Sequence, residues 1–135
     1  MFGGFLRRSW VFLSLSALMF AAGCGGASEY TVSGTVTLDG QPVEEGEIRF
    51  LPTDGQGTPF AGPIVNGKFE SRASAGQNRV EINATRESAT PAPDGLPNFE
   101  SYIPAAYNSQ STLTVTIPPD SGSLTFDLKS DGSSP

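Results

Sequence analysis

The side chain with the most definite chemistry is the thiol of Cys24, which is the only cysteine in the 135 residues. It follows small residues at 21–23, and these end an apolar stretch that begins at Trp10. Arg7 and Arg8 precede that stretch. A basic segment, a short apolar segment and small residues, in this order, are typical of a secretory signal and its cleavage site. Because a lone thiol cannot form a disulfide within the chain, Cys24 is free for another covalent bond.

The segment 21–24 resembles a bacterial lipobox. The resemblance implies that the thiol of Cys24 is joined to a diacylglycerol, that the signal peptide 1–23 is removed, and that Cys24 becomes the first residue of the mature chain. We therefore expect an exported protein that lipid holds on a membrane, at the outer membrane or the periplasmic face rather than in the cytoplasm. Gly25 after the cysteine favours the outer membrane over the inner one.

Two other interpretations of the first residues stay open. A plain secretory signal with a chance cysteine is one, because Ala21 stands where Leu is usual in a lipobox. A retained membrane anchor is the other. It is disfavoured, since an apolar run of about 13 residues spans ~20 Å as a helix, whereas the hydrocarbon core is ~30 Å thick.

The amino-acid composition disfavours or excludes several classes of partner, catalytic site and metal site. The chain has 8 basic and 14 acidic residues, and loss of Arg7 and Arg8 with the signal makes the rest more acidic still. An acidic surface disfavours nucleic acid as a partner, and docking on anionic lipid by charge. The chain has no histidine, which excludes Ser-His-Asp triads, Cys-His pairs and most zinc sites. We expect no enzyme activity, no cofactor and no metal site.

Acidic residues gather in one short segment and are the candidates for a calcium site. Calcium favours several carboxylate and carbonyl oxygens, but the spacing of a calcium-binding loop is absent. Paired carboxylates also hydrolyse glycosides, yet a single sandwich of this size offers no deep cleft. We expect a solvated surface formed by these residues: Asp39, Glu44, Glu45 and Glu47.

The segment 87–110 breaks the regular spacing of the chain and carries both prolines and aromatic residues. Loops of this length in a compact domain are usually functional or disordered. One interpretation is a binding platform made by Phe99, Tyr102 and Tyr107, since aromatic rings suit sugars and protein partners. We favour the other, in which Phe99, Ile103 and Tyr107 fold back and close one end of the domain, while Tyr102 stays exposed.

Seven short segments between Tyr30 and Lys129 have the period-two alternation of half-buried strands. Turn signals separate them, among them Asp39-Gly40 and Asn66-Gly67. The pattern predicts a seven-stranded antiparallel β-sandwich at 30–129 with Phe50 and Phe126 in its core. A tether at 24–29 precedes it and a flexible tail at 130–135 follows it. The predicted strands are 30–38, 47–51, 61–65, 68–72, 79–86, 111–117 and 123–129.

Residues 32–40, 42–43 and 46–52, together with 67–69 and 80–82, resemble the carboxypeptidase regulatory-like domains. The runs 103–108 and 111–115 are similar to the small planctomycete lipoproteins built on that domain. The resemblance implies a transthyretin-like, prealbumin-type sandwich and transfers no catalytic residue. One departure is Gln77-Asn78, where Pro or Gly followed by an aromatic residue or Lys is expected, and it concerns the packing at the start of one strand.

Together these features predict a non-catalytic, lipid-anchored interaction or structural module of the cell envelope. We expect a monomer that contacts the membrane through lipid on Cys24 and binds an envelope protein or a glycan. A carbohydrate-binding module at the cell surface or in the periplasm is the alternative, because related prealbumin-type sandwiches include sugar binders. An enzyme is the remote alternative.

Overall fold

The computed structural model describes residues 26–135, so the expected signal peptide and Cys24 lie outside the described residues. This part of the chain is almost entirely β-structure. It forms ten strands and one short 3-10 helix, η1, whose bounds are β1 Glu29–Leu38, β2 Gln41–Pro42, β3 Glu45–Pro52, β4 Phe60–Val65, β5 Lys68–Ser74, β6 Gly76–Asn83, β7 Thr85–Glu87, β8 Phe99–Ser101, η1 Ala105–Tyr107, β9 Thr114–Ile117 and β10 Leu124–Leu128. Within the same residues no helix has the length and apolar character needed to cross a bilayer.

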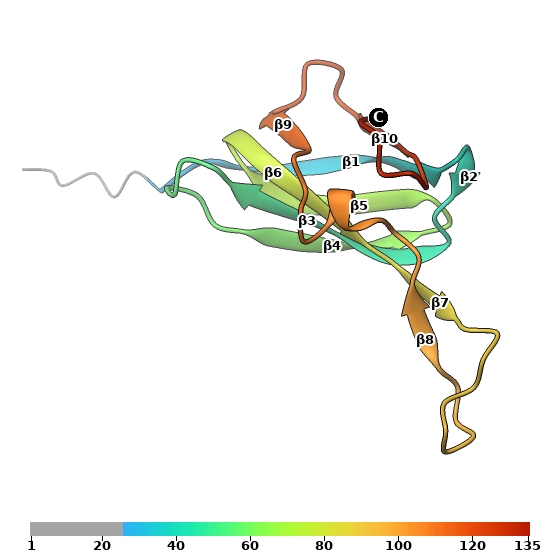
Figure 1. Ribbon diagram of the computed structural model, residues 1–135. Helices are drawn as coiled ribbons and strands as arrows, with labels where there is room; N and C mark the ends of the chain where they lie inside the picture. The colour runs from blue at the N-terminus through green and yellow to red at the C-terminus, as the bar shows by residue number, and fades with distance from the viewer. Residues whose placement is uncertain (1–25) are drawn as a thin grey trace, which may run out of the picture.

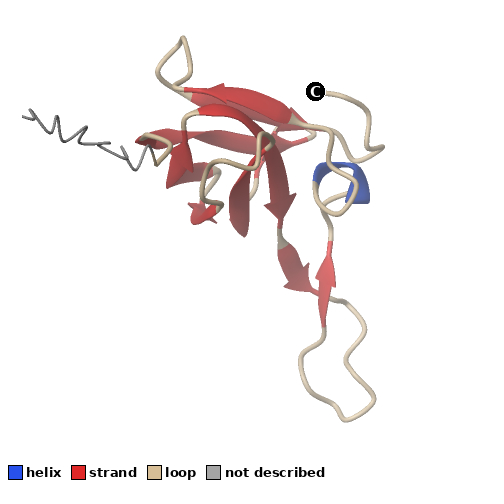
Figure 2. Cartoon of the chain, turned by 90° about the vertical axis from the view of Figure 1, so that its left-hand side faces the viewer, coloured by secondary structure: helices blue, strands red, loops and turns tan. Residues whose placement is uncertain are grey.

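The main sheet is one continuous path in the order β10-β1-β5-β4-β3-β6-β9, and β2 pairs with the end of β1. The path curls so that its two halves enclose a shared core (Figures 1 and 2). β7 and β8 form a separate two-stranded sheet. The predicted all-β sandwich is confirmed.

The core is built from the inward positions of every strand in the main path. Phe50 and Phe126 are buried, as predicted, and Phe69 lies between them with ring centroids 6.0 and 6.1 Å away. These tilted aromatic contacts add to the apolar area that the alternation buries. The buried apolar side chains are Val32, Val36, Val43, Ile48, Phe50, Ile64, Phe69, Ala73, Val80, Ile82, Ala84, Ile103, Tyr107, Ile117, Phe126 and Leu128.

Both predicted turns have the left-handed backbone that a two-residue hairpin requires. Asp39 and Gly40 have φ of 50° and 80°, and they join β1 to β2. Asn66 and Gly67 have φ of 49° and 74°, and they join β4 to β5. Positive φ at both central residues matches the right-handed twist of the flanking strands. These turns therefore fix the register of the strands on either side.

One ladder departs from the antiparallel arrangement. β10 pairs with β1 in parallel, from Gly34↔Leu124 to Leu38↔Leu128, whereas every other ladder in residues 26–135 is antiparallel. Parallel neighbours need a crossover rather than a tight turn. Here the chain leaves β9 at one edge of the path and returns as β10 at the other edge.

Two predicted strands differ from the structure by three or more residues at an end. The segment 79–86 divides, because β6 ends at Asn83 and β7 belongs to the second sheet. The segment 111–117 is regular only from Thr114. Before it, Ser111 donates a side-chain hydrogen bond to the Val80 carbonyl, and the Val80 amide donates one to the Leu113 carbonyl at 2.8 Å. Side-chain and irregular backbone bonds thus replace the ladder there.

Candidate functional site

The segment 87–110 has two parts that differ from each other. Its first part is a hairpin, whereas in its second part Ile103 and Tyr107 fold back and are buried in the core, as expected. β7 and β8 pair from Thr85↔Ser101 to Glu87↔Phe99, and the Ser88 amide extends the ladder by donating to the Asn98 carbonyl at 2.7 Å. Figures 1 and 2 show the hairpin projecting from the body of the sandwich.

The root of the hairpin is held by Arg86 and Tyr102. The Arg86 Nε donates to a Glu100 carboxylate oxygen at 2.9 Å, and its guanidinium lies over the Tyr102 ring, 5.4 Å from the centroid. The Tyr102 amide donates to the Ala84 carbonyl at 3.3 Å. These contacts join both strands of the hairpin to the edge of the core, where Tyr102 packs.

The three aromatic residues of the predicted binding loop have different surroundings. Tyr107 is buried, and its hydroxyl donates to the Ser133 carbonyl and accepts from the Lys129 amide. Tyr102 is half-buried, and Phe99 is 64% exposed. The expectations that Phe99 folds back and that Tyr102 is the exposed ring are therefore wrong. Phe99 stands on the projecting hairpin, beyond reach of the core.

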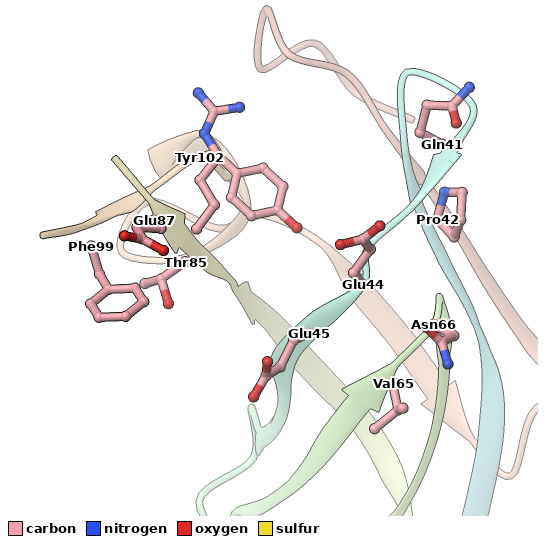
Figure 3. Close-up of a pocket in the computed structure, with 11 residues that line it drawn as sticks. Gln41, Pro42, Glu44, Glu45, Val65, Asn66, Thr85, Glu87, Phe99 and Tyr102 are labelled. Atoms are coloured by element: carbon pink, nitrogen blue, oxygen red, sulfur yellow. The ribbon is translucent and has the colours of Figure 1, made fainter. Parts of the chain in front are cut away.

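An open groove of about 950 Å³ lies at the root of the hairpin (Figure 3). A second hollow of about 500 Å³ shares Glu45, Thr85 and Phe99 with it and continues along β3 and β6. We call the larger space the hairpin groove. Its walls come from the β2–β3 segment, the β4–β5 turn, β7 and β8, and the residues that line it are Gln41, Pro42, Glu44, Glu45, Val65, Asn66, Thr85, Arg86, Glu87, Phe99 and Tyr102.

The groove exists because β7 turns away from β3. The β3–β6 ladder runs antiparallel as far as Glu47↔Asn83 and then stops. Beyond it Gly46 packs against the chain, since a Cβ on that glycine would lie 2.5 Å from the Asn83 carbonyl oxygen and 3.0 Å from the Ala84 Cβ. From Thr85 onward the chain pairs with β8 instead. The space between the start of β3 and β7 is thus left open.

The groove carries more negative than positive charge. Three carboxylates, those of Glu44, Glu45 and Glu87, line it beside the single guanidinium of Arg86. Burial, and next the Glu44 carboxylate, raise the pKa of Tyr102 above its ordinary value of 10.0, while Arg86 opposes them. The Tyr102 hydroxyl is therefore protonated at neutral pH. Figure 3 shows that this hydroxyl points toward Glu44.

The acidic residues considered for calcium do not converge on one point. The Asp39 carboxylate accepts a hydrogen bond from the Ser130 amide at 3.1 Å, and Glu47 lies 3.7 Å from the Arg49 guanidinium. Glu44 and Glu45 line the groove. Among residues 26–135 no three His, Cys, Asp or Glu side chains are placed to hold a metal ion.

Four residues singled out from the sequence line the groove, namely Phe99, Tyr102, Glu44 and Glu45, whereas the others that line it were not expected. Val65, Thr85 and Glu87 are among the unexpected ones. β7 and β8 have three residues each, which is too short for a period-two alternation to be detected in sequence. No sequence pattern therefore predicted that these two strands pair. The only available signal was the length of the segment 87–110.

Comparison with known proteins adds no relative. No protein-family model, no curated protein and no solved structure matches this chain. The resemblance to carboxypeptidase regulatory-like domains remains a hypothesis, and the fold and the groove are the features that bear on function.

Proposed function

We propose that this protein is a non-catalytic binding module of the cell envelope, anchored through lipid on Cys24, and that it captures its partner with the β7–β8 hairpin and the hairpin groove. The observation that carries the proposal is the exposed ring of Phe99 on a strand that projects from the sandwich. Exposed apolar side chains that gather at a groove are typical of an interaction surface.

The exposed apolar residues concentrate at this end of the domain. In the described part of the chain the large apolar side chains with high exposure are Tyr30, Val65, Leu96 and Phe99. Val65 and Phe99 line the groove, and Leu96 lies in the loop that joins β7 to β8. Single exposed apolar residues are ordinary, but two of these four line one groove and a third lies on the same hairpin, which supports a binding role for the groove.

The position of the groove fits a lipid anchor at Cys24. β1 begins at Glu29, five positions after that cysteine, and its ten residues extend ~33 Å at ~3.3 Å per residue. Figure 1 places β2 and the hairpin at the end of the sandwich opposite the start of β1. A lipid on Cys24 would therefore leave the groove facing away from the membrane, where a partner can reach it.

A carbohydrate-binding module is the second candidate, because a sugar ring would stack on Phe99. Sugar binders commonly present more than one ring to a chain of sugars, and here Tyr102 lies half-buried beneath Arg86. The arrangement favours a protein partner over a glycan.

The proposal is tested by photo-crosslinking in the cell of origin, with a photoreactive phenylalanine analogue in place of Phe99. We expect a neighbouring envelope component to be captured from this position. The same analogue at Glu70, an exposed position on β5 that lies outside the groove, is the control. Equal capture from both positions, or none from Phe99, would contradict the proposal.

A further inference from the structure

The groove has a free strand edge along one wall. β7 pairs with β8 and with no other strand in the described residues, so its second edge has unpaired backbone amides and carbonyls, and its residues Thr85, Arg86 and Glu87 line the groove. The start of β3 forms the opposite wall with Glu44 and Glu45. An extended peptide that enters such a space bonds its backbone to the free edge and places alternate side chains in the flanking pockets.

The three carboxylates that line the groove are not paired with basic side chains of the same protein. No basic side chain described in residues 26–135 forms an ion pair with Glu44, Glu45 or Glu87. The one guanidinium in the groove, that of Arg86, is already paired with Glu100. A bound lysine or arginine side chain would meet three carboxylates without a competing cation. The charge of the lining therefore selects a basic ligand over an acidic or neutral one.

Apolar contacts complete the fit to a peptide rather than to a free cation. Phe99 is 64% exposed and Val65 is 57% exposed, and both line the groove. An extended segment with apolar and basic residues in alternation would cover both exposed side chains while its basic side chains approach the carboxylates. Burial of these two residues supplies the apolar part of the binding free energy.

From these three features we propose that the hairpin groove binds an extended, lysine- or arginine-bearing segment of a partner protein, added as a strand to the free edge of β7. This inference rests on the proposed function and specifies the chemistry of the partner. Phe99 is the apolar anchor, and Glu44, Glu45 and Glu87 are the charge partners.

The test uses the full chain in detergent and titrates it by calorimetry with synthetic peptides of about eight residues, the length of an ordinary strand. The first peptide alternates lysine with valine, and the second alternates glutamine with valine. We expect the lysine peptide to bind more tightly, and its advantage to shrink at about 0.3 M salt because screening weakens exposed charge pairs. Equal binding of the two peptides would overturn the proposal.

Protein variants locate the binding. The double change Glu44→Gln with Glu45→Gln should weaken the lysine peptide by about five- to tenfold, as loss of two exposed charge pairs predicts. Phe99→Ala should weaken both peptides. Glu70→Gln is the matched control, because that carboxylate lies on β5 outside the groove. All four positions are exposed, so an unchanged denaturation midpoint confirms that each variant folds.

Two further ligands separate this inference from the function on which it rests. A lysine peptide with every second backbone amide methylated should bind about tenfold more weakly if its backbone pairs with β7, and undiminished binding would overturn the strand addition. A β-1,4-linked oligosaccharide should not bind. If it binds through Phe99 and the lysine peptide does not, the inferred chemistry is wrong while a binding module remains. Failure of crosslinking at Phe99 would instead contradict the proposed function, namely that this protein is a binding module.

Discussion

Gly34 lies directly against the backbone of Leu124. A Cβ atom on Gly34 would overlap the Leu124 carbonyl oxygen and lie 3.0 Å from the Leu124 nitrogen. The two residues begin the parallel ladder between β1 and β10. A glycine inside a strand allows such a close approach of another backbone, and here it occurs where the last strand joins the first.

Gly34→Ala should destabilise the fold, because backbone rather than a flexible side chain occupies the space of the added methyl group. Overpacking of a close contact costs about 1–3 kcal/mol or more. Chemical denaturation of the full chain in detergent would measure it. Gly26→Ala is the control, since nothing lies within 4 Å of a Cβ at that position. An equal midpoint for both variants would mean that β10 does not pack on Gly34.

Phe50→Ala should reduce the free energy of unfolding by about 3–5 kcal/mol, because the side chain is buried and its removal leaves a cavity beside Phe69. Phe99→Ala removes the same group from an exposed position and should change stability by less than about 0.5 kcal/mol. Denaturant titration of both variants tests the pair. A large loss for Phe99→Ala would place that ring in the core.

The contact between Ser130 in the C-terminal segment and Asp39 in the β1–β2 turn should weaken in acid. Hydrogen bonds from Ser130, first from its side chain and then from its amide, hold the pKa of Asp39 below its ordinary value of 3.8. A lowered pKa in the folded state means that the contact stabilises the fold above pH 3.8, and that this contribution is lost as the pH falls through the folded value.

The chemical shift of the Ser130 amide, followed by NMR against pH, measures this contact. We expect a titration midpoint below 3.8, and no such transition in Asp39→Asn. Asparagine is the suitable replacement because it tolerates the φ of 50° at this position. A midpoint at or above 3.8 in the unmodified protein would contradict the assignment.

Cys24→Ala should abolish lipid attachment. The expected mature chain begins at Cys24 and carries a diacylglycerol on its thiol, so its intact mass after membrane extraction should exceed that of the bare polypeptide. The variant should lack the added mass and leave the membrane fraction. An unmodified mass for the parent protein would exclude the lipid anchor and leave the plain secretory signal or the retained membrane anchor.

The strands of the sandwich were predictable because their alternation is strong. In β3 the inward residues Ile48 and Phe50 are buried while the intervening Arg49 is exposed, and this contrast can be detected in sequence. The turns were predictable for a separate reason, since Asn66-Gly67 satisfies a backbone requirement that few residue pairs meet. Local chemistry was sufficient in both cases.

The groove was not predictable because long-range pairing decides it. Nothing in Thr85-Arg86-Glu87 shows that its partner lies at 99–101, nor that the β3–β6 ladder stops at Asn83. The unexpected Asn78 is a similar case. It is buried, and its side-chain amide donates to the carbonyls of Ser74 and Gly76 at 2.8 and 3.0 Å. It holds the turn before β6 from inside, where an aromatic residue or Lys was expected.

The parallel pairing of β1 with β10 has a consequence for the order in which the molecule assembles. Thr37 on β1 bonds to Asp127 on β10, 90 residues later in the chain. At about 5–20 residues per second, β10 is synthesised roughly 5–20 seconds after β1. During that interval one side of β1 has no native neighbour, and any other extended chain can occupy it. A chain of this protein that begins to fold before its last strand is made therefore leaves one edge of β1 open to mispairing.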